Sequence, residues 1–199
     1  MSELAFRVLF LVLLLLVGGV RGYYSRKLGV SHLSVSDEAV EREGRELAWL
    51  RVALLPVFYG YVVLFLLDPA WMEWSHAPVP AWARWGGVAL MAVGVPLEIW
   101  VHRALGASWS TSMEVGHEPE LITHGPYRFV RHPMYALALP IFAGIALLAA
   151  DWVLIALSVA GLVVILSRLP VEDRMMVEHF GDEYRAYMQR TGALVPRLW

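Results

Sequence analysis

The chain passes from a polar segment into a long apolar run at Gly125-Pro126-Tyr127-Arg128-Phe129-Val130-Arg131-His132-Pro133-Met134-Tyr135. The stretch places two Arg, one His, two Tyr and two Pro within eleven residues. Because proline restricts its own φ and that of the residue before it, we expect bent, non-helical backbone at Tyr127 and His132. Two interpretations fit these residues equally well: a site that holds a ligand at the lip of a membrane helix, or a basic, aromatic collar that anchors the helix at the interface.

The composition is that of a membrane protein. Hydrophobic residues make up 58% of the 199 residues, and the mean hydropathy is +0.56, which is more apolar surface than one small core can bury. The net charge of -2 comes without a basic stripe, so nothing supports a nucleic-acid partner. The absence of cysteine excludes disulfides, thiolate catalysis and cysteine metal sites, and we predict no metal.

Five apolar segments are near the length that crosses a hydrocarbon core of roughly 30 Å as a helix. They run from about Leu4 to Val20, Leu47 to Leu67, Trp85 to Val101, Met134 to Ala150 and Trp152 to Ser167. We interpret the first as a retained span, because no small-residue cleavage site follows it. The last two are separated by Asp151 alone, which predicts a tight hairpin with Asp151 and Trp152 at its tip. The predicted fold is all-α: a polytopic membrane bundle of five transmembrane helices with a C-terminal helical hairpin.

Basic residues between the spans predict the orientation, since positive charge collects on the cytoplasmic side. The segments between spans one and two, between spans three and four and after span five each carry several arginines, whereas the hairpin tip carries none. We therefore expect the N-terminus outside, and the C-terminus and a cofactor pocket on the cytoplasmic side. The loop from Asp68 to Trp82 holds three Pro and three Trp and is expected to be an interfacial cap without chemistry.

Two ionisable residues lie one helical turn apart in the third span, Glu98 and His102. An ionisable group near a span is costly and is a functional candidate by default. The alternative is that the two pair with each other or with Arg103; this is slightly favoured for His102 and left open for Glu98. The polar loop from Ser108 to His124 follows, and its hydroxyls, carboxylates and His117 either line a pocket or are simply solvated.

The fifth span ends at Arg168, and Glu172 follows four residues later, so a continued helix would place both on one side; Pro170 could kink it. One interpretation is an intrahelical ion pair. The other is that Arg168 meets the anionic head of an amphiphile entering from the leaflet. The segment from Val171 to Arg190 then predicts one amphipathic helix, with an apolar side made by Met175, Met176, Phe180, Tyr184 and Tyr187.

In combination, these residues resemble the isoprenylcysteine carboxyl methyltransferase family and its phospholipid methyltransferase relatives. The resemblance lies in the order and spacing of Leu121, Gly125-x-Tyr127-x-x-x-Arg131-His132-Pro133-x-Tyr135, a two-helix hairpin, Arg168-x-x-x-Glu172-Asp173, Phe180-Gly181-x-x-Tyr184-x-x-Tyr187 and Pro196. It covers roughly residues 108–196. It divides the chain into a three-span membrane region, residues 1–105, and a catalytic region, residues 106–199.

The resemblance implies an integral membrane methyltransferase that uses S-adenosylmethionine (SAM) and releases S-adenosylhomocysteine. In the family the cofactor sits in a cytoplasmic pocket between the loop before the hairpin and the helix after it. The positions that would contact the cofactor here are Glu120, Leu121, Ile122, Tyr127, His132, Pro133, Met134, Tyr135 and Glu172. Arg168 would face the substrate head, so Arg168 and Glu172 are the expected catalytic residues. The chain departs from eukaryotic members at Pro119, where they carry His, and at Asp173, where they carry a second Glu.

The implied reaction moves a methyl group to a lipophilic acceptor, a small molecule or a lipidated substrate reached through the bilayer. The family's namesake enzymes favour a carboxylate, which is ionised at neutral pH and needs no base. The alternative is a phospholipid amine or another small acceptor. An amine, thiol or phenol would have to lose a proton, and His132, Glu172 or Glu98 would then be candidates for the base.

Two other classes of function are weighed against methyl transfer. One is an NADPH-dependent membrane enzyme like the sterol reductases, although the sequence offers no arginine cluster for the extra phosphate. The other is a small transporter or a haem-binding membrane protein. The sequence shows neither the internal repeat of a transporter nor histidines on facing mid-span positions.

Overall fold

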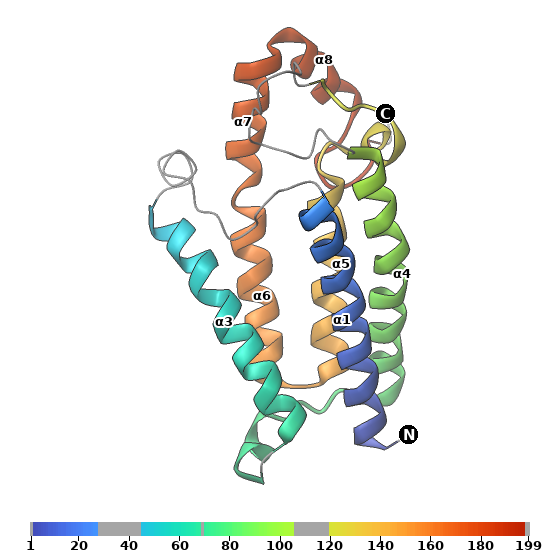
Figure 1. Cartoon of the computed structure of the whole chain (residues 1–199), viewed down its shortest axis with the longest axis vertical. Coiled ribbons are helices and arrows are strands. Elements are labelled where there is room, and N and C mark those ends of the chain that lie inside the picture. The colour runs from blue at the N-terminus through green and yellow to red at the C-terminus, as the bar shows by residue number, and fades with distance from the viewer. Residues whose placement is uncertain (1, 28–44, 69, 106–119, 198–199) are drawn as a thin grey trace.

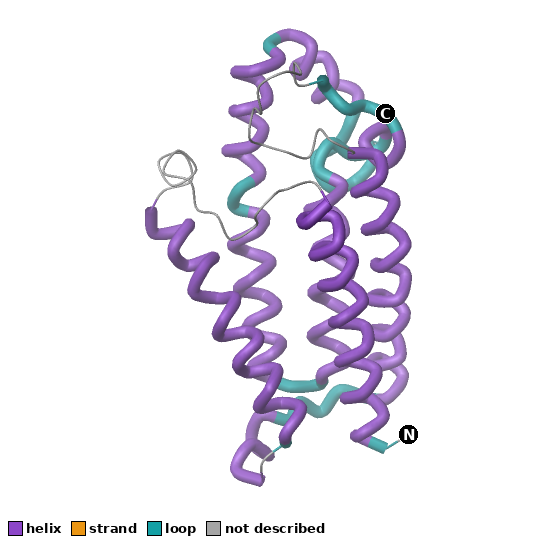
Figure 2. The backbone as a smooth tube through the Cα atoms, in the orientation of Figure 1, coloured by secondary structure: helices purple, strands orange, loops and turns teal. Residues whose placement is uncertain are grey.

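The computed structural model describes residues 2–27, 45–68, 70–105 and 120–197, and within these ranges all regular structure is helical (Figures 1 and 2). In chain order the elements are α1 (Glu3–Lys27), α3 (Arg45–Leu67), η1 (Ala70–Ser75), α4 (Ala81–Leu105), η3 (Gly125–Arg128), α5 (Pro133–Ala149), α6 (Trp152–Leu166), α7 (Leu169–Phe180) and α8 (Asp182–Arg190). The two termini lie at opposite ends of the bundle (Figure 1). We call these ends the N-terminal end and the C-terminal end; the latter carries η3, α7 and α8. The all-α prediction is confirmed.

Four apolar helices in the described residues are long enough to cross a membrane. They are α1, α3, α4 and the run Trp152–Phe180, which joins α6 to α7, while α5 is a shorter apolar helix of 17 residues. This is the integral membrane bundle that the sequence predicts, with α5 shorter than a full span. Helices α1 and α4 continue past their predicted ends to Lys27 and Leu105, because an internally hydrogen-bonded helix can extend beyond its apolar run into the polar interface.

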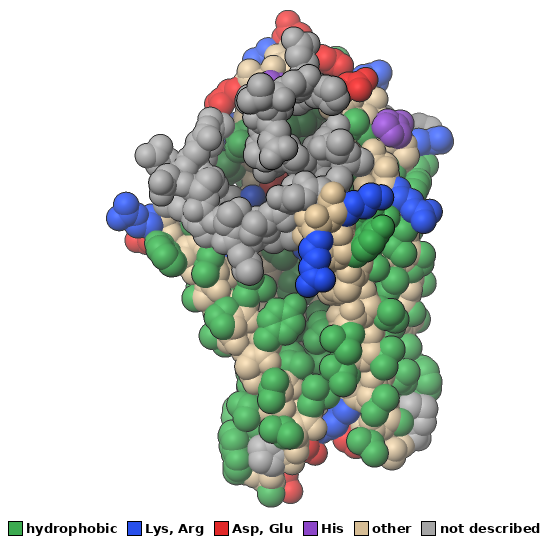
Figure 3. Space-filling view, viewed as in Figure 1, with side chains coloured by type: hydrophobic (Ala, Val, Ile, Leu, Met, Phe, Trp, Pro, Cys, Tyr) green, Lys and Arg blue, Asp and Glu red, His purple; other side chains and the backbone are tan. Residues whose placement is uncertain are grey.

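The outside of the bundle is apolar along its middle. Large hydrophobic side chains point outward from α1, α3 and α6, among them Leu15, Val63 and Val163, each more than half exposed. In Figure 3 the middle of the visible face is largely green, and the charged side chains gather toward the two ends. Such a surface is strongly unfavourable in water, so lipid is its natural surroundings.

Helices α4 and α5 pack closely because each carries a glycine at the contact. A Cβ on Gly87 would lie 2.7 Å from the backbone N of Leu148, and a Cβ on Gly144 would lie 2.6 Å from Cγ of Met91. The two glycines therefore permit an approach of the helix backbones that any side chain would prevent. Met91 and Leu148 are themselves fully buried in the core.

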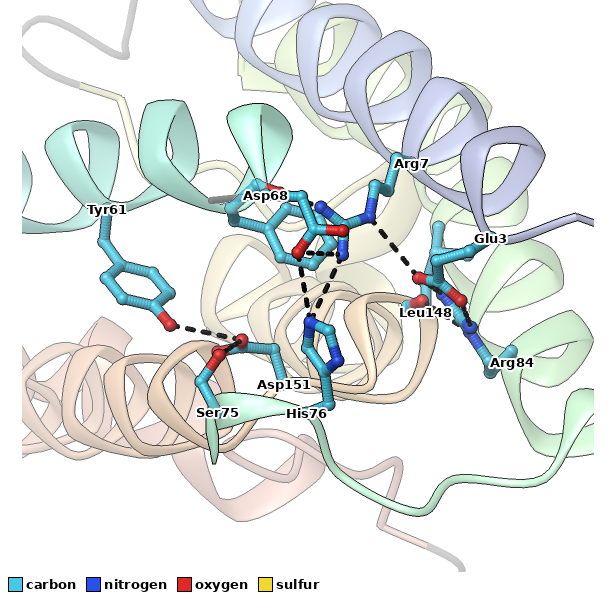
Figure 4. A network of polar contacts seen from close by, with 10 residues as sticks. Glu3, Arg7, Tyr61, Asp68, Ser75, His76, Arg84, Leu148 and Asp151 are labelled. Carbon is cyan, nitrogen blue, oxygen red and sulfur yellow. Dashed lines mark hydrogen bonds and ion pairs between the residues drawn. The ribbon is translucent and has the colours of Figure 1, made fainter. Parts of the chain in front are cut away.

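A network of polar side chains closes the N-terminal end (Figure 4). Arg7 of α1 pairs with Asp68, which follows α3, at 2.9 Å. Arg84 of α4 donates to Glu3 of α1 at 2.9 Å through Nη2, and its Nε donates to the carbonyl oxygen of Leu148 in α5 at 3.1 Å. Both arginines are buried, so the network joins α1 to α3, α4 and α5.

The hairpin between α5 and α6 is attached to the same end through Asp151. Its Oδ1 accepts hydrogen bonds from the backbone N–H groups of two residues at the start of α6, both at 3.0 Å, as an N-cap does. Its Oδ2 accepts from the hydroxyls of Ser75 at 2.6 Å and Tyr61 at 3.1 Å (Figure 4). The predicted hairpin with Asp151 at its tip is confirmed, and this carboxylate also holds η1 and α3 against the tip.

The prediction that the segment from Asp68 to Trp82 is an interfacial cap agrees only in part with the structure. Its tryptophans are exposed, at 64% for Trp71, 65% for Trp74 and 79% for Trp82, as an interfacial cap requires. Ser75, in contrast, is fully buried against Asp151. The segment therefore caps the interface and also contributes to the polar network.

The prediction of one helix from Val171 to Arg190 is wrong. The structure has two helices, α7 and α8, separated at Gly181, whose φ is +56°. Glycine adopts this left-handed conformation without a steric penalty and ends α7 there. Pro170 lies in the first turn of α7, where its missing N–H costs little, rather than inside a continuous helix. No side chain of α7 is fully buried, whereas α8 buries Tyr184 and Tyr187.

Candidate functional site

The segment before α5 has the bent backbone that its prolines predict. Gly125–Arg128 form the single 3₁₀ turn η3 with Pro126 at its start, so Tyr127 lies in this turn rather than in an α-helix. His132 precedes α5 with φ of −123° and ψ of 64°. Gly125 has φ of +60°, and a Cβ there would lie 2.9 Å from Cβ of Ala104. Glycine at this position therefore allows η3 to lie against the end of α4.

The chain beyond α8 holds this segment in place. The backbone N–H of Arg131 donates to the carbonyl of Gly192 at 2.9 Å, and that of His132 donates to the carbonyl of Ala193 at 3.1 Å. Tyr187 of α8 donates its hydroxyl to the carbonyl of Tyr127 at 2.6 Å. The backbone that carries His132 is thus fixed from the C-terminal side before any ligand is considered.

Asp173 of α7 is a centre of hydrogen bonds at the C-terminal end. Its Oδ1 lies 2.8 Å from Nε2 of His132 and accepts the hydroxyl of Tyr184 at 2.6 Å. Arg131 donates to the same carboxylate from Nε and Nη2, each at 3.1 Å. These donors come from the start of α5, from the residues before it and from α8. A carboxylate with this many donors is well satisfied in its ionised form.

Glu172, the neighbouring residue, has a different set of contacts. Its Oε1 accepts a short hydrogen bond from the hydroxyl of Tyr135 and lies 3.5 Å from Nη2 of Arg168. Its Oε2 lies 3.8 Å from Nδ1 of His132. The sequence allowed an ion pair between Arg168 and Glu172, and the two do pair, with Arg168 at the N-cap of α7 rather than inside a continuous helix. The structure brings the expected catalytic residues together with His132 and Tyr135, which lie more than 30 positions earlier in the chain.

The tyrosines beside Asp173 are hydrogen-bond donors at neutral pH. Burial raises the pKa of Tyr184, and the hydrogen bond to Asp173 raises it further. Burial raises the pKa of Tyr187 to about 12 and also raises that of Tyr127. None of these phenols is therefore a proton acceptor under physiological conditions.

The remaining residues expected to contact the cofactor lie in the segments next to His132 and η3. Pro133 and Met134 open α5 directly after His132, and Pro133 is buried. Glu120, Leu121 and Ile122 lead into η3; Glu120 is exposed and the other two are half-buried. Most of the polar loop from Ser108 to His124, including Pro119, lies outside the described residues, so its expected role stays a prediction.

Sequence reasoning missed the organising role of Asp173. Its partners Arg131 and Tyr184 both belong to the family spacing quoted above, but no role at the site was expected of them. The one feature of the sequence that could have indicated this contact is the opposite charge of Arg131 and Asp173. With 42 positions between them, the sequence alone does not say that the two pair.

Glu98 and His102 lie in the C-terminal part of α4 and are 4% and 1% exposed. Nδ1 of His102 lies 2.8 Å from the backbone carbonyl oxygen of Glu98. The described contact is therefore with the backbone of Glu98, not the side-chain pair that the sequence allowed.

A family model supplies the assignment that the geometry suggests. The phospholipid methyltransferase model matches residues 82–183, about half of the chain. The chain belongs to the phospholipid methyltransferase family. The match begins in α4 and ends in α8, so it includes both halves of the cluster around Glu172 and Asp173 together with the hairpin between them.

Two curated relatives are similar to the chain. Methanethiol S-methyltransferase 1 of Bradyrhizobium diazoefficiens is 28% identical over 182 residues, which cover 82% of this chain and 63% of the relative. Uncharacterized protein YpbQ of Bacillus subtilis is 32% identical over 97 residues, which cover 48% of this chain and 58% of the relative. The chain thus spans less than two thirds of the length of each relative.

The fold and the comparisons agree on the class of protein. This phospholipid methyltransferase family member is an integral membrane protein of a methyltransferase family, as the sequence resemblance implied. The family assignment favours methyl transfer over the reductase, transporter and haem-protein alternatives.

Proposed function

We propose that this protein transfers a methyl group from SAM to a lipophilic acceptor at the C-terminal end of the bundle. The observation that carries the proposal is the meeting of His132, at the start of α5, with Glu172 in α7, at 3.8 Å between Nδ1 and Oε2. The two come from different helices on either side of the hairpin. One ligand can contact both only because the fold brings them together.

The residues present suit SAM, which carries an ammonium group, a carboxylate, a sulfonium and an adenine ring. The side chain of Glu172 is 33% exposed, and its Oε2 reaches His132 only at a distance longer than a hydrogen bond. That oxygen can accept from a cationic group of a ligand. Met134, which is half-buried at the start of α5, is proposed to offer apolar surface for an adenine ring, with the buried Pro133 beside it in the chain. Asp173, whose carboxylate already binds several donors, supports the frame of the site instead.

When bound, SAM supplies a methyl carbon on a sulfonium whose leaving group is already activated. The residues of the chain then have to align the acceptor with that carbon and exclude water. Arg168 lies 3.5 Å from Oε1 of Glu172. A cation that attracts an anionic acceptor therefore stands next to the carboxylate proposed to hold the donor, an arrangement that favours an in-line displacement between the two ligands.

Two acceptor classes have support. The resemblance to isoprenylcysteine carboxyl methyltransferases favours a carboxylate, which Arg168 would position. The relative named as a methanethiol S-methyltransferase, which is similar over 82% of this chain, favours a thiol. Both classes suit a bundle whose apolar surface gives lipophilic molecules access from the bilayer.

We also propose that the C-terminal end faces the cytoplasm. Arg174 and Arg185 are exposed at this end, whereas Arg7 and Arg84 at the N-terminal end are buried in ion pairs with acidic residues. Because the chain has no native cysteine, single cysteines can test this orientation. In intact cells a membrane-impermeant thiol reagent should label Ser2→Cys and leave Asp182→Cys unlabelled until the membrane is opened; the reverse pattern would overturn the orientation.

The decisive experiment for the function measures binding and transfer with the same purified protein. SAM and S-adenosylhomocysteine should give calorimetric heat and raise the thermal midpoint, and NADPH should do neither. Labelled SAM should then label at least one member of a panel of prenyl-cysteine carboxylates, fatty acids, alkanethiols, phospholipid amines and phenolic lipids. Stabilisation by NADPH but not by SAM would refute the proposal.

A further inference from the structure

Glu98 is a buried ionisable residue that the proposed cofactor site leaves unused. It lies in α4 toward the C-terminal end and is 4% exposed. Its Oε2 is buried and has no hydrogen-bond partner among the described residues of the chain. A carboxylate oxygen removed from water without a partner is strongly unfavourable, and it persists in a membrane helix where function requires it.

Arg21 connects Glu98 with the site. This α1 residue is close enough to interact electrostatically with Glu98. It also interacts electrostatically with Tyr135 and, as a like charge, with Arg168, the two residues that contact Oε1 of Glu172. Glu98 also lies in the part of α4 against which η3 packs, since a Cβ on Gly125 would lie 2.9 Å from Cβ of Ala104. The carboxylate is therefore linked with the proposed site rather than isolated in the bundle.

His102 adds a second basic group on the same face of α4. Its Nδ1 lies 2.8 Å from the carbonyl oxygen of Glu98, and since a carbonyl only accepts, Nδ1 carries the hydrogen. A neutral ring then presents Nε2 as a proton acceptor. Tyr24 of α1 stacks on this ring with 4.8 Å between the centroids, which fixes its plane. The local chemistry is that of a site that receives protons.

We infer that Glu98 is the general base of the reaction and that the acceptor is a thiol, an inference that rests on the proposed function. A lipophilic thiol is mostly protonated at neutral pH, because even the more acidic cysteine thiol has an ordinary pKa of about 8.5. It therefore needs a base close to the sulfur. Glu98 offers a buried oxygen without a hydrogen-bond partner among the described residues, and we assign it as that base.

The atoms balance in one displacement. The S–H bond of the thiol breaks, and its proton passes to Oε2 of Glu98. The sulfur electron pair forms a bond to the methyl carbon, and the pair of the broken C–S bond stays on the sulfur of S-adenosylhomocysteine. The products are a methyl thioether and a protonated Glu98, which returns its proton to water before the next cycle.

A carboxylate acceptor fits this position poorly. It would bring a second negative charge toward Glu98 in surroundings of low dielectric constant, where like charges repel strongly. It would also leave Glu98 without a role, since a carboxylate has no proton to lose near neutral pH. Glu98 therefore discriminates between the two acceptor classes left open above.

The test compares wild type with Glu98→Gln, which keeps the size of the side chain and removes the base. Glu73→Gln, an exposed position in η1 at the opposite end, is the matched control. Each variant is assayed for SAM binding by calorimetry, for methylation of a medium-chain alkanethiol and of a prenyl-cysteine carboxylate, and for the pH profile of kcat/KM. Infrared difference spectra of the S-adenosylhomocysteine complex, recorded on adding the alkanethiol, report protonation of a carboxylate without turnover.

We expect Glu98→Gln to bind SAM within about twofold of wild type and to lose about 100-fold or more of thiol methylation at neutral pH. The loss should shrink as the pH rises toward the thiol's own pKa, where the nucleophile ionises without help. The carboxyl band should appear in wild type and Glu73→Gln and be absent in Glu98→Gln. The groups that act on Glu98 and bear on its profile are Arg21 of α1 and His102 of α4. Tyr24 stacks on His102, and Tyr135 interacts with Arg21, so both bear on the profile indirectly.

Three results would overturn the inference. They are thiol methylation by Glu98→Gln at the wild-type rate, loss of SAM binding in this variant, and wild-type activity toward carboxylates but not thiols. The last leaves the proposed methyltransferase function intact. Failure of wild type to bind SAM would instead refute the proposed function itself, so the two failures are distinguishable.

Discussion

Nε2 of His132 lies 2.8 Å from Oδ1 of Asp173, although 41 positions separate the two residues. The contact joins the start of α5 to α7, the two helices whose residues are proposed to share SAM. Arg131 and Tyr184 bind the same carboxylate. Asp173 therefore contributes to the relative position of the two helices at the site, beside the hydrogen bond from Tyr135 to Glu172.

Replacing Asp173 should weaken the contact between the start of α5 and α7. In Asp173→Asn the amide presents one acceptor oxygen and an NH₂ group that faces existing donors, so we expect a loss of about 1.5–3 kcal/mol in unfolding free energy and weaker SAM binding. The exposed Asp182→Asn, at a carboxylate that pairs with Arg185 three positions on, should change stability by less than about 0.5 kcal/mol. Thermal unfolding in one detergent, with and without SAM, measures both; equal midpoints for the two variants would contradict the role of Asp173.

Replacing Glu172 should weaken SAM binding more than stability. Glu172→Gln removes the charge that is proposed to hold a cationic part of SAM, and losing one charge-assisted hydrogen bond lowers affinity by roughly 10- to 100-fold. Glu178→Gln, at an exposed position of the same helix α7, should bind SAM as wild type does. Calorimetric titration with SAM decides the matter, and unchanged affinity in a Glu172→Gln, His132→Ala double variant would refute the site assignment.

Replacing Arg168 should affect the acceptor more than the cofactor. In Arg168→Ala we expect SAM affinity within a few-fold of wild type and a loss of about tenfold or more in kcat/KM for an anionic acceptor, because the cation proposed to position it is gone. Arg174→Ala, an exposed arginine of α7, is the control for general charge. If Arg168→Ala lost only SAM binding, Arg168 would be assigned to the cofactor rather than to the acceptor.

A side chain at Gly125 should displace η3. Gly125→Ala must adopt φ of +60° and brings a Cβ to 2.9 Å from Cβ of Ala104, so we expect a cost of at least about 1–2 kcal/mol and weaker SAM binding. Gly60→Ala in α3, where a Cβ meets nothing within 4 Å, should leave stability unchanged or slightly raise it. Thermal midpoints of the two variants test this; a Gly125→Ala protein as stable as Gly60→Ala would show that η3 tolerates the residue.

Replacing Asp151 should lower stability without changing affinity at the site. Asp151→Ala removes the N-cap of α6, worth about 0.5–2 kcal/mol, and strips Ser75 and Tyr61 of their acceptor. Since this residue lies at the N-terminal end, far from the cluster around Glu172, the KM for both substrates should stay at the wild-type value. A lower thermal midpoint with altered SAM affinity would mean that the two ends of the bundle are coupled.

Hydropathy alone was enough to predict the membrane bundle, because an apolar segment of this length satisfies its backbone hydrogen bonds in lipid by forming a helix. The hairpin tip was predictable for the same reason, since a single charged residue between two apolar runs must lie at an interface. The meeting of His132 and Glu172 followed from the family resemblance rather than from any physical pattern in the residues. Whether they bind SAM stays a prediction.

The remaining features depend on contacts between distant positions. Nothing in the sequence shows that Arg84 pairs with Glu3, because the two are 81 positions apart and Arg84 looked like the end of a loop. The break at Gly181 was missed because the apolar spacing continues through it from Phe180 to Tyr184. The role of Asp173 was missed because several arginines could have been its partner, and only the folded chain selects Arg131.

The buried arginines at the N-terminal end have a mechanical consequence. Through their ion pairs, Arg7 and Arg84 hold the start of α1 against the neighbouring helices. Helices held by buried ion pairs at this end should separate more readily at the opposite end, where Tyr24 of α1 stacks on His102 of α4. A lipid tail that enters between these helices would therefore do so at the C-terminal end, where Glu98 and Glu172 lie. A cross-link between the helices at that end should block its entry without changing the rest of the bundle.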